Sequence, residues 1–171
     1  MIKKTILVLA LFFVFSSCKK EIKKDDFIPI TTVSSYTYKE LKPLLHKDDG
    51  KIYVVNFWAT WCAPCVKELP YFEKLKEVYQ DKNVEVLLVS LDFPKQIEER
   101  LIPFINKKKL KSKVVLLNDS NEDIWIKAID STWSGAIPAT LIYNKEKRKF
   151  FHYFSNAIKI KNTIFRPFIV F

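Results

Sequence analysis

Glycine is nearly absent from this chain, with two residues among 171. Loops that cradle phosphate groups need several closely spaced glycines, so the composition excludes a P-loop and a dinucleotide-binding fingerprint. Histidine is equally scarce, and cysteine occurs three times. Hydrophobic residues nevertheless make up 49% of the sequence and aromatic residues 15%, which is enough for an ordinary core. The length favours a single globular domain.

The first 17 residues have the pattern of a secretory signal peptide. Two lysines are followed by an unbroken apolar run over residues 6–15, which is too short to remain as a membrane-spanning helix. Small residues then precede Cys18, an arrangement that resembles the signal of bacterial lipoproteins, in which the cysteine becomes the lipidated N-terminus. The alternative is a plain signal peptide with a free Cys18. We expect a polar tether over residues 18–35 and a folded domain over residues 36–171.

Removal of the signal peptide and lipidation of Cys18 would leave only Cys62 and Cys65 as free thiols. An exported protein with one close pair is not a scaffold stapled by disulfides, so the pair has a chemical role or forms one local bridge. A zinc site would need further cysteine or histidine ligands at suitable spacing, which neither His46 nor His152 supplies. We therefore expect no metal and no cofactor, and a protein lipid-anchored to a membrane on the periplasmic side of the cell envelope.

The chain is basic, with a formal net charge of +10. Such a surface could favour anionic membranes or acidic partners. The densest cluster comprises five lysines within seven residues, Lys107, Lys108, Lys109, Lys111 and Lys113. A solvated loop that keeps the protein soluble is the simpler interpretation of such a cluster, and nucleic-acid binding is not expected of an exported protein.

Hydrophobic periodicity predicts a mixed α/β fold. The predicted strands cover residues 51–59, 84–91, 114–117, 139–143 and 149–154, and the predicted helices cover residues 66–80, 96–109 and 122–129, with a short helix near residues 41–45. Pro103 should kink or interrupt the second long helix. This order predicts a central sheet with helices on both faces, whose first part is parallel through right-handed crossovers.

The sequence Trp61-Cys62-Ala63-Pro64-Cys65 lies where a predicted buried strand gives way to a predicted helix. Unpaired N–H groups and the dipole at a helix N-terminus stabilise a thiolate, which is the form of cysteine that attacks a disulfide. Two intervening residues let both sulfurs meet across the first helical turn, where a proline is tolerated. Cys62 is the expected nucleophile and Cys65 the resolving thiol. A purely structural bridge would close almost no loop and so stabilise little.

Residues 55–65 (VNFWATWCAPC) resemble the active-site segment of the thioredoxin superfamily, and more narrowly of its TlpA/ResA-like envelope branch. Asn56 stands where cytoplasmic thioredoxins usually have a buried aspartate, and Glu68 follows Cys65 by three residues, as in that branch. Residues 135–140 (GAIPAT) are similar to the family's cis-proline segment. The resemblance covers about residues 50–154 and implies a thioredoxin-like fold with a central mixed sheet flanked by helices.

The resemblance also implies roles for individual residues. Trp61, Pro64, Ile137 and Pro138 would contact the substrate, with a cis peptide bond before Pro138 and strand-like pairing of the Ile137 backbone with the substrate chain. Glu68 would share a helix face with Cys65 and, if partly buried, could move protons for it; its alternative is a surface acid favoured by the helix dipole. Trp58 is expected in the core, whereas Trp133 could border the substrate groove or simply pack.

The activity that the resemblance implies is reduction of protein disulfides in the cell envelope, for example during cytochrome c maturation, with electrons from a membrane thiol–disulfide donor. Three alternatives stay open: a peroxiredoxin-like thiol peroxidase, a copper-binding module of the same fold, and an interaction module without redox chemistry. The family closes its fold with a C-terminal helix. Residues 155–171 lack sustained helical periodicity and contain Pro167, so we expect an atypical end to the fold.

Overall fold

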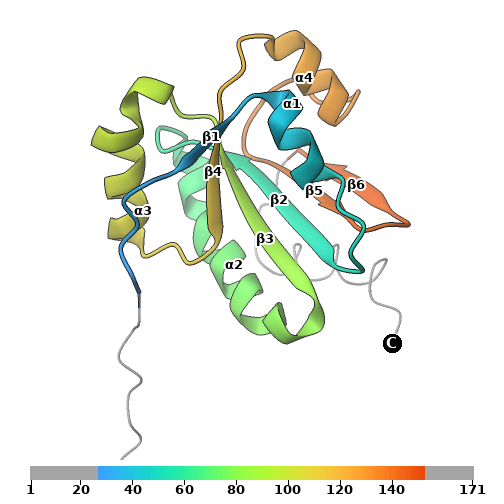
Figure 1. The fold of residues 1–171 in the computed structure, drawn as a ribbon, viewed down its shortest axis with the longest axis horizontal. Helices are drawn as coiled ribbons and strands as arrows, with labels where there is room; N and C mark the ends of the chain where they lie inside the picture. The colour runs from blue at the N-terminus through green and yellow to red at the C-terminus, as the bar shows by residue number, and fades with distance from the viewer. Residues whose placement is uncertain (1–26, 153–171) are drawn as a thin grey trace, which may run out of the picture.

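The computed structural model describes residues 27–152, which form a mixed six-stranded sheet between two layers of helices (Figure 1). The predictions on the signal peptide, the lipidation of Cys18 and the C-terminal residues 155–171 lie outside the described part. The described strands are β1 (Ser34–Tyr36), β2 (Ile52–Trp58), β3 (Val84–Ser90), β4 (Lys113–Leu117), β5 (Ala139–Tyr143) and β6 (Arg148–Phe151). The α-helices are α1 (Tyr38–Leu41), α2 (Ala63–Tyr79), α3 (Ile102–Lys108) and α4 (Glu122–Ile129).

The strand order is β1-β4-β3-β2-β5-β6, with β2 near the middle of the sheet. The first four strands in this order are parallel, whereas β5 runs antiparallel to β2 and β6 antiparallel to β5. All seven residues of β2 are buried, as expected of a strand that is covered on both faces. The carboxyl ends of the parallel strands meet at one edge of the sheet, and the chain leaves β2 toward the cysteines at that edge.

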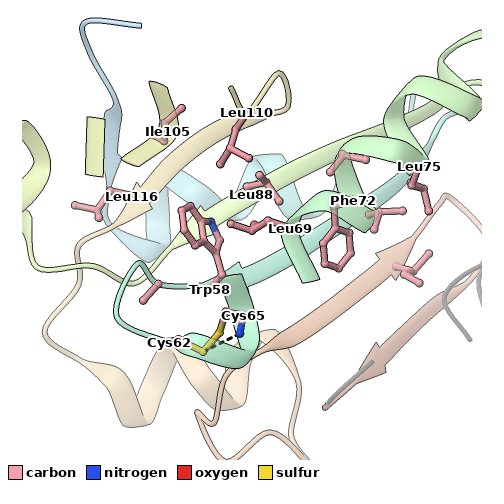
Figure 2. Close-up of a cluster of buried hydrophobic side chains, with 14 of the residues drawn as sticks. Trp58, Cys62, Cys65, Leu69, Phe72, Leu75, Leu88, Ile105, Leu110 and Leu116 are labelled. Atoms are coloured by element: carbon pink, nitrogen blue, oxygen red, sulfur yellow. Dashed lines mark hydrogen bonds between the residues drawn. A yellow bond between two sulfur atoms is a disulfide. The ribbon is translucent and has the colours of Figure 1, made fainter. Parts of the chain in front are cut away.

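Alternation along β2 divides the core into two clusters. Val54 and Trp58 pack with α2 and α3, while Val55 and Phe57 pack on the opposite face with α1 and α4. Figure 2 shows the first cluster, in which the side chains of α2 lie along the sheet and end at the two cysteines. Phe72 is fully buried there. Loss of such a ring in a core typically costs about 3–5 kcal/mol, so α2 is held firmly against the sheet.

Most predicted elements are confirmed, including the helix over residues 122–129 and the strand over residues 139–143. Pro103 interrupts the predicted helix over residues 96–109 as expected. A 3₁₀ turn (Pro94–Gln96) and a π-turn (Ile97–Leu101) precede α3, which begins one residue before the proline. A proline near a helix start is favourable because its missing N–H would be unpaired there anyway.

The N-terminal boundary of the domain differs from the prediction. The predicted tether extends to residue 35, but β1 already pairs Ser34 and Ser35 with β4. Further upstream, the backbone of Ile30 exchanges two hydrogen bonds with the Asn106 side chain of α3, at 2.9 and 3.0 Å. The ordered domain therefore includes residues from about 30 onward. None of the helices in residues 27–152 is both long enough and apolar enough to cross a bilayer.

Candidate functional site

The two cysteines lie at the junction of β2 and α2 and form a disulfide (Figure 2). Their Cα atoms are 5.2 Å apart, within one turn of the helix start. Cys62 is 5% exposed and Cys65 is completely buried against the core cluster. Cys62 is thus the more exposed of the two residues, in the order expected from the sequence.

Cys62 occupies the position of an N-cap residue. Its carbonyl oxygen accepts the Val66 N–H at 3.0 Å, and its Sγ accepts the Cys65 N–H at 3.3 Å. A serine or threonine at an N-cap accepts the same backbone N–H with its hydroxyl. In the reduced protein, this N–H and the positive end of the helix dipole would act on a Cys62 thiolate. The helix start is therefore built to favour negative charge on this sulfur.

The loop before β5 faces the disulfide. Ile137–Pro138 is a cis peptide bond, as predicted, and the carbonyl oxygen of Ile137 lies 3.8 Å from Cys62 Sγ. The register of the sheet explains the approach, because the antiparallel pairing of Ala139 with Phe57 places the start of β5 beside the end of β2. Pro138 is buried and Ile137 is partly exposed. The predicted proline loop and the predicted cysteine motif thus come together.

Trp133 packs in the core against this loop and is not exposed at the surface. It is fully buried among Phe57, Trp125 and Phe150, and its Nε1–H donates to the Ala136 carbonyl at 2.8 Å. Of the two possible roles for Trp133, the structure supports packing. Gly135 follows with φ +85°, a left-handed conformation that costs other residues free energy, so one of the two glycines in the chain is required here.

Two exposed residues flank the cysteines in sequence, and a third follows the buried Asp92 in the loop after β3. Trp61 is 50% exposed, Pro64 is exposed, and Phe93 in the loop after β3 is 62% exposed. Trp61 and Pro64 were predicted from the sequence, but Phe93 was missed because a single aromatic in a loop carries no periodic signal. A large exposed aromatic side chain next to Cys62, such as Trp61, is suited to contact a partner polypeptide.

Two polar side chains are buried near the cysteines. Glu68, one helical turn beyond Cys65 in α2, is only 4% exposed, which excludes the alternative of a surface acid. Asn56 is fully buried in β2 and donates from Nδ2 to Thr140 Oγ1 at 3.2 Å. Alternation along β2 places it on the same face as Val54 and Trp58, which pack with α2.

Asp92 is the principal polar residue of the site that the sequence analysis missed. It lies two residues beyond β3 and is 3% exposed. Its carboxylate accepts hydrogen bonds from Thr60, in the loop just before the cysteines. A partial signal was available, since the first part of the sheet was predicted to be parallel, although the pairing of β2 with β3 is known only from the structure. An acid just after one strand could therefore reach the loop after the other.

The residues described by the structure contain no group of three or more histidine, cysteine, aspartate or glutamate side chains that could hold a metal ion. The site consists of a disulfide at a helix start, a cis-proline loop and a buried glutamate. Together with the sheet order, these features define the thioredoxin-like class of proteins.

Sequence comparison places the chain in a family within this class. Residues 31–148 match the AhpC/TSA family, and the chain belongs to it. It is 33% identical over 107 residues to the thiol-disulfide oxidoreductase ResA of Bacillus thuringiensis, over 63% of this chain and 54% of that protein. It is 44% identical over 54 residues to the ResA of Oceanobacillus iheyensis, over 32% and 28% of the two chains. The chain therefore aligns with about half or less of the length of these relatives.

Solved structures support the fold. A thioredoxin-related protein from Neisseria meningitidis superposes with a TM-score of 0.58 at 21% identity, over 68% of this chain and 84% of that one. A thiol:disulfide interchange protein from Bacteroides sp. gives a TM-score of 0.52 at 24% identity, over 67% and 71%. The thioredoxin-like fold expected from the sequence is thus confirmed, as is the similarity to ResA-type proteins.

Trp133→Phe tests the support of the proline loop. It keeps an aromatic ring but removes the N–H that binds the Ala136 carbonyl, so we expect the free energy of unfolding to fall by about 1–3 kcal/mol. Trp125→Phe is the matched control, because it removes a similar bond to the Asp119 carbonyl. Both variants should lose stability in urea titrations, but only Trp133→Phe should shift the amide resonances of Ile137 and Cys62. Equal shifts in both variants would contradict the support role.

Proposed function

We propose that this protein is a thiol–disulfide oxidoreductase that reduces disulfides in other proteins. The observation that carries the proposal is the position of Cys62, at a helix start and 3.8 Å from the Ile137 carbonyl. Relatives of ResA type are named for the same chemistry. Reduction, rather than oxidation, is the direction that the resemblance to the TlpA/ResA-like branch suggests, and the reduction potential decides it.

The reaction has two steps. The Cys62 thiolate attacks one sulfur of a substrate disulfide, which forms a mixed disulfide and releases the other substrate sulfur as a thiolate. The Cys65 thiolate then attacks Cys62 Sγ, which forms the Cys62–Cys65 disulfide and releases the second substrate thiolate. Two electrons pass from the enzyme dithiol to the substrate. The backbone of Ile137 lies where it could hold the substrate chain beside Cys62 in a strand-like arrangement.

Glu68 is proposed to accept the proton that the Cys65 thiol loses. Cys65 must lose its proton before it can attack the mixed disulfide, and a buried sulfur cannot pass it directly to water. Glu68 lies one turn away on the same helix and is itself shielded from solvent. A carboxylate in such a position can accept the proton during the second step.

The proposed location is the periplasmic side of the cell envelope. Support comes from the signal-like residues 1–17 and from Cys18, which would carry the lipid that anchors the protein to a membrane. The protein would then act on exported protein disulfides and would need a membrane thiol–disulfide donor to regenerate its dithiol. A cytochrome c precursor is one substrate that the resemblance suggests.

A thiol peroxidase is the second candidate function. A peroxidatic cysteine depends on nearby threonine and arginine groups, whereas the contacts of Cys62 Sγ are the Cys65 amide and the Ile137 carbonyl. Arg148 donates to the carbonyls of Leu45 and Ile129 at the far end of β5 and β6. These contacts favour disulfide exchange over peroxide reduction.

Cys65→Ala should trap substrates. Without the resolving thiol, the mixed disulfide on Cys62 persists, so partner proteins should co-purify with the variant and be released by dithiothreitol. The double variant Cys62→Ser/Cys65→Ala is the control and should recover none of them, although both variants retain Cys18. Absence of any Cys62-linked partner, together with consumption of hydrogen peroxide by the unmodified protein, would replace the proposal with the peroxidase.

The reduction potential of the Cys62–Cys65 pair tests the direction. A reductase should have a potential near that of thioredoxin, about −270 mV, measured by equilibration of the full chain with dithiothreitol. A value of about −120 mV would assign the protein to disulfide formation instead.

Glu68→Gln should slow the second step, because the amide cannot take up a proton. We expect kcat for reduction of a protein disulfide to fall about 100-fold near neutral pH with little change in KM, and the mixed disulfide to accumulate. Glu73→Gln is the matched control on the same helix, since Glu73 binds the backbone amides of Lys111 and Ser112 away from the cysteines. Unchanged turnover in Glu68→Gln would exclude the proton-transfer role.

A further inference from the structure

The carboxylate of Asp92 joins the end of β3 to the loop before Cys62. The Thr60 N–H donates to both carboxylate oxygens at 3.2 and 3.0 Å, and the Thr60 hydroxyl donates to Oδ1 at 2.6 Å. The Ser90 hydroxyl donates to Oδ2 at 2.7 Å and accepts the Asp92 N–H at 3.0 Å. The two carboxylate oxygens of Asp92 thus act as the acceptors for Thr60 and for the Ser90 hydroxyl.

Thr60 lies inside the tight turn that carries Cys62. The Cys62 N–H donates to the Ala59 carbonyl at 3.2 Å, which closes the turn over Thr60 and Trp61. The turn is also tied to β3 at its base, where the Leu91 N–H donates to the Trp58 carbonyl at 2.7 Å. Asp92 therefore fixes the middle of a four-residue turn whose last residue is the nucleophile.

We propose that Asp92 is a positioning residue for disulfide exchange. By fixing Thr60, it holds Cys62 at the helix start, in contact with the Cys65 amide and within reach of Cys65 Sγ. Asp92 does not touch the sulfur atoms, so it acts through the turn. The inference rests on the proposed function. It adds the end of β3, through Asp92, to a site whose other parts come from β2, α2 and the loop before β5.

The consequence is measurable in the cysteine pair itself. Two thiols that are held close together close their disulfide more readily than two thiols on a loose turn, because less orientational freedom is lost. Loss of the Asp92 contacts should therefore weaken the Cys62–Cys65 disulfide relative to the dithiol. A role in folding alone would lower stability and leave this equilibrium unchanged.

The test compares Asp92→Ala, Asp92→Asn and Asp119→Ala in the full chain, equilibrated with mixtures of reduced and oxidised dithiothreitol. Asp92→Ala removes every acceptor and should lower the equilibrium constant for disulfide formation about tenfold, which corresponds to a potential about 30 mV less negative. Asp92→Asn keeps one carbonyl oxygen for Thr60 but removes the charge. It should stay within about threefold of the unmodified protein if position, rather than charge, is the cause.

Asp119→Ala is the matched control. Asp119 follows β4 as Asp92 follows β3, and it accepts the N–H groups of Tyr38 and Asn121 at 3.0 and 2.9 Å. The hydrogen bonds from the Asn121 and Tyr38 backbones hold the pKa of this carboxyl below its usual value, so it too is an acceptor for a loop. Its removal should lower the melting temperature without changing the dithiothreitol equilibrium.

Three results would overturn the inference: an unchanged equilibrium in Asp92→Ala, an equal shift in Asp92→Asn, or an equal shift in Asp119→Ala. If Asp92→Ala does not fold, Thr60→Val decides in its place, because it removes only the hydroxyl bond. It should shift the equilibrium about threefold in the same direction, while Thr60→Ser should not. An unmodified protein whose cysteines failed to exchange with dithiothreitol at all would instead refute the proposed function.

Discussion

The N–H of Cys65 and the sulfur of Cys62 form the contact on which the site depends. This contact exists only because α2 begins at the residue after Cys62, so that an amide with no partner inside the helix points at the sulfur. The same few residues end a fully buried strand and start a helix that packs along the sheet. The chemistry of the cysteines therefore depends on the packing of α2 against the sheet, through Leu69 and Phe72, as much as on the groups that touch the sulfurs.

The rest of the site is assembled from strand ends that the sheet brings to one edge. β2 supplies the turn with Cys62, β3 supplies Asp92, and the antiparallel β5 begins at the cis-proline loop. Each contribution is held by its own buried support: the core beneath α2, the Thr60–Asp92 bonds, and Trp133 beneath the loop. Because these supports come from separate elements, the arrangement around the sulfur is already formed before a substrate arrives.

The sequence predicted the parts of the fold whose patterns are long or strongly apolar, such as β2, β3 and α2, and it predicted the cis proline through a family resemblance. It missed β1, since Ser34, Ser35 and Tyr36 have no hydrophobic period and become a strand only by pairing with β4. It also missed Asp92, because a lone acid after a strand is indistinguishable from a solvated loop residue until the neighbouring turn is placed. For Trp133 and Glu68, burial had to be observed before one of two interpretations could be chosen.

The path of the chain at the N-terminal side of the domain determines where it lies relative to the disulfide. Residues 27–33 lead into the first residue of β1, at the edge where the parallel strands begin, and Ile30 is fastened there to Asn106. The cysteines follow the last residue of β2, at the opposite edge. Within residues 27–152, the chain therefore enters the sheet at the edge opposite to the disulfide, and the body of the sheet separates the two.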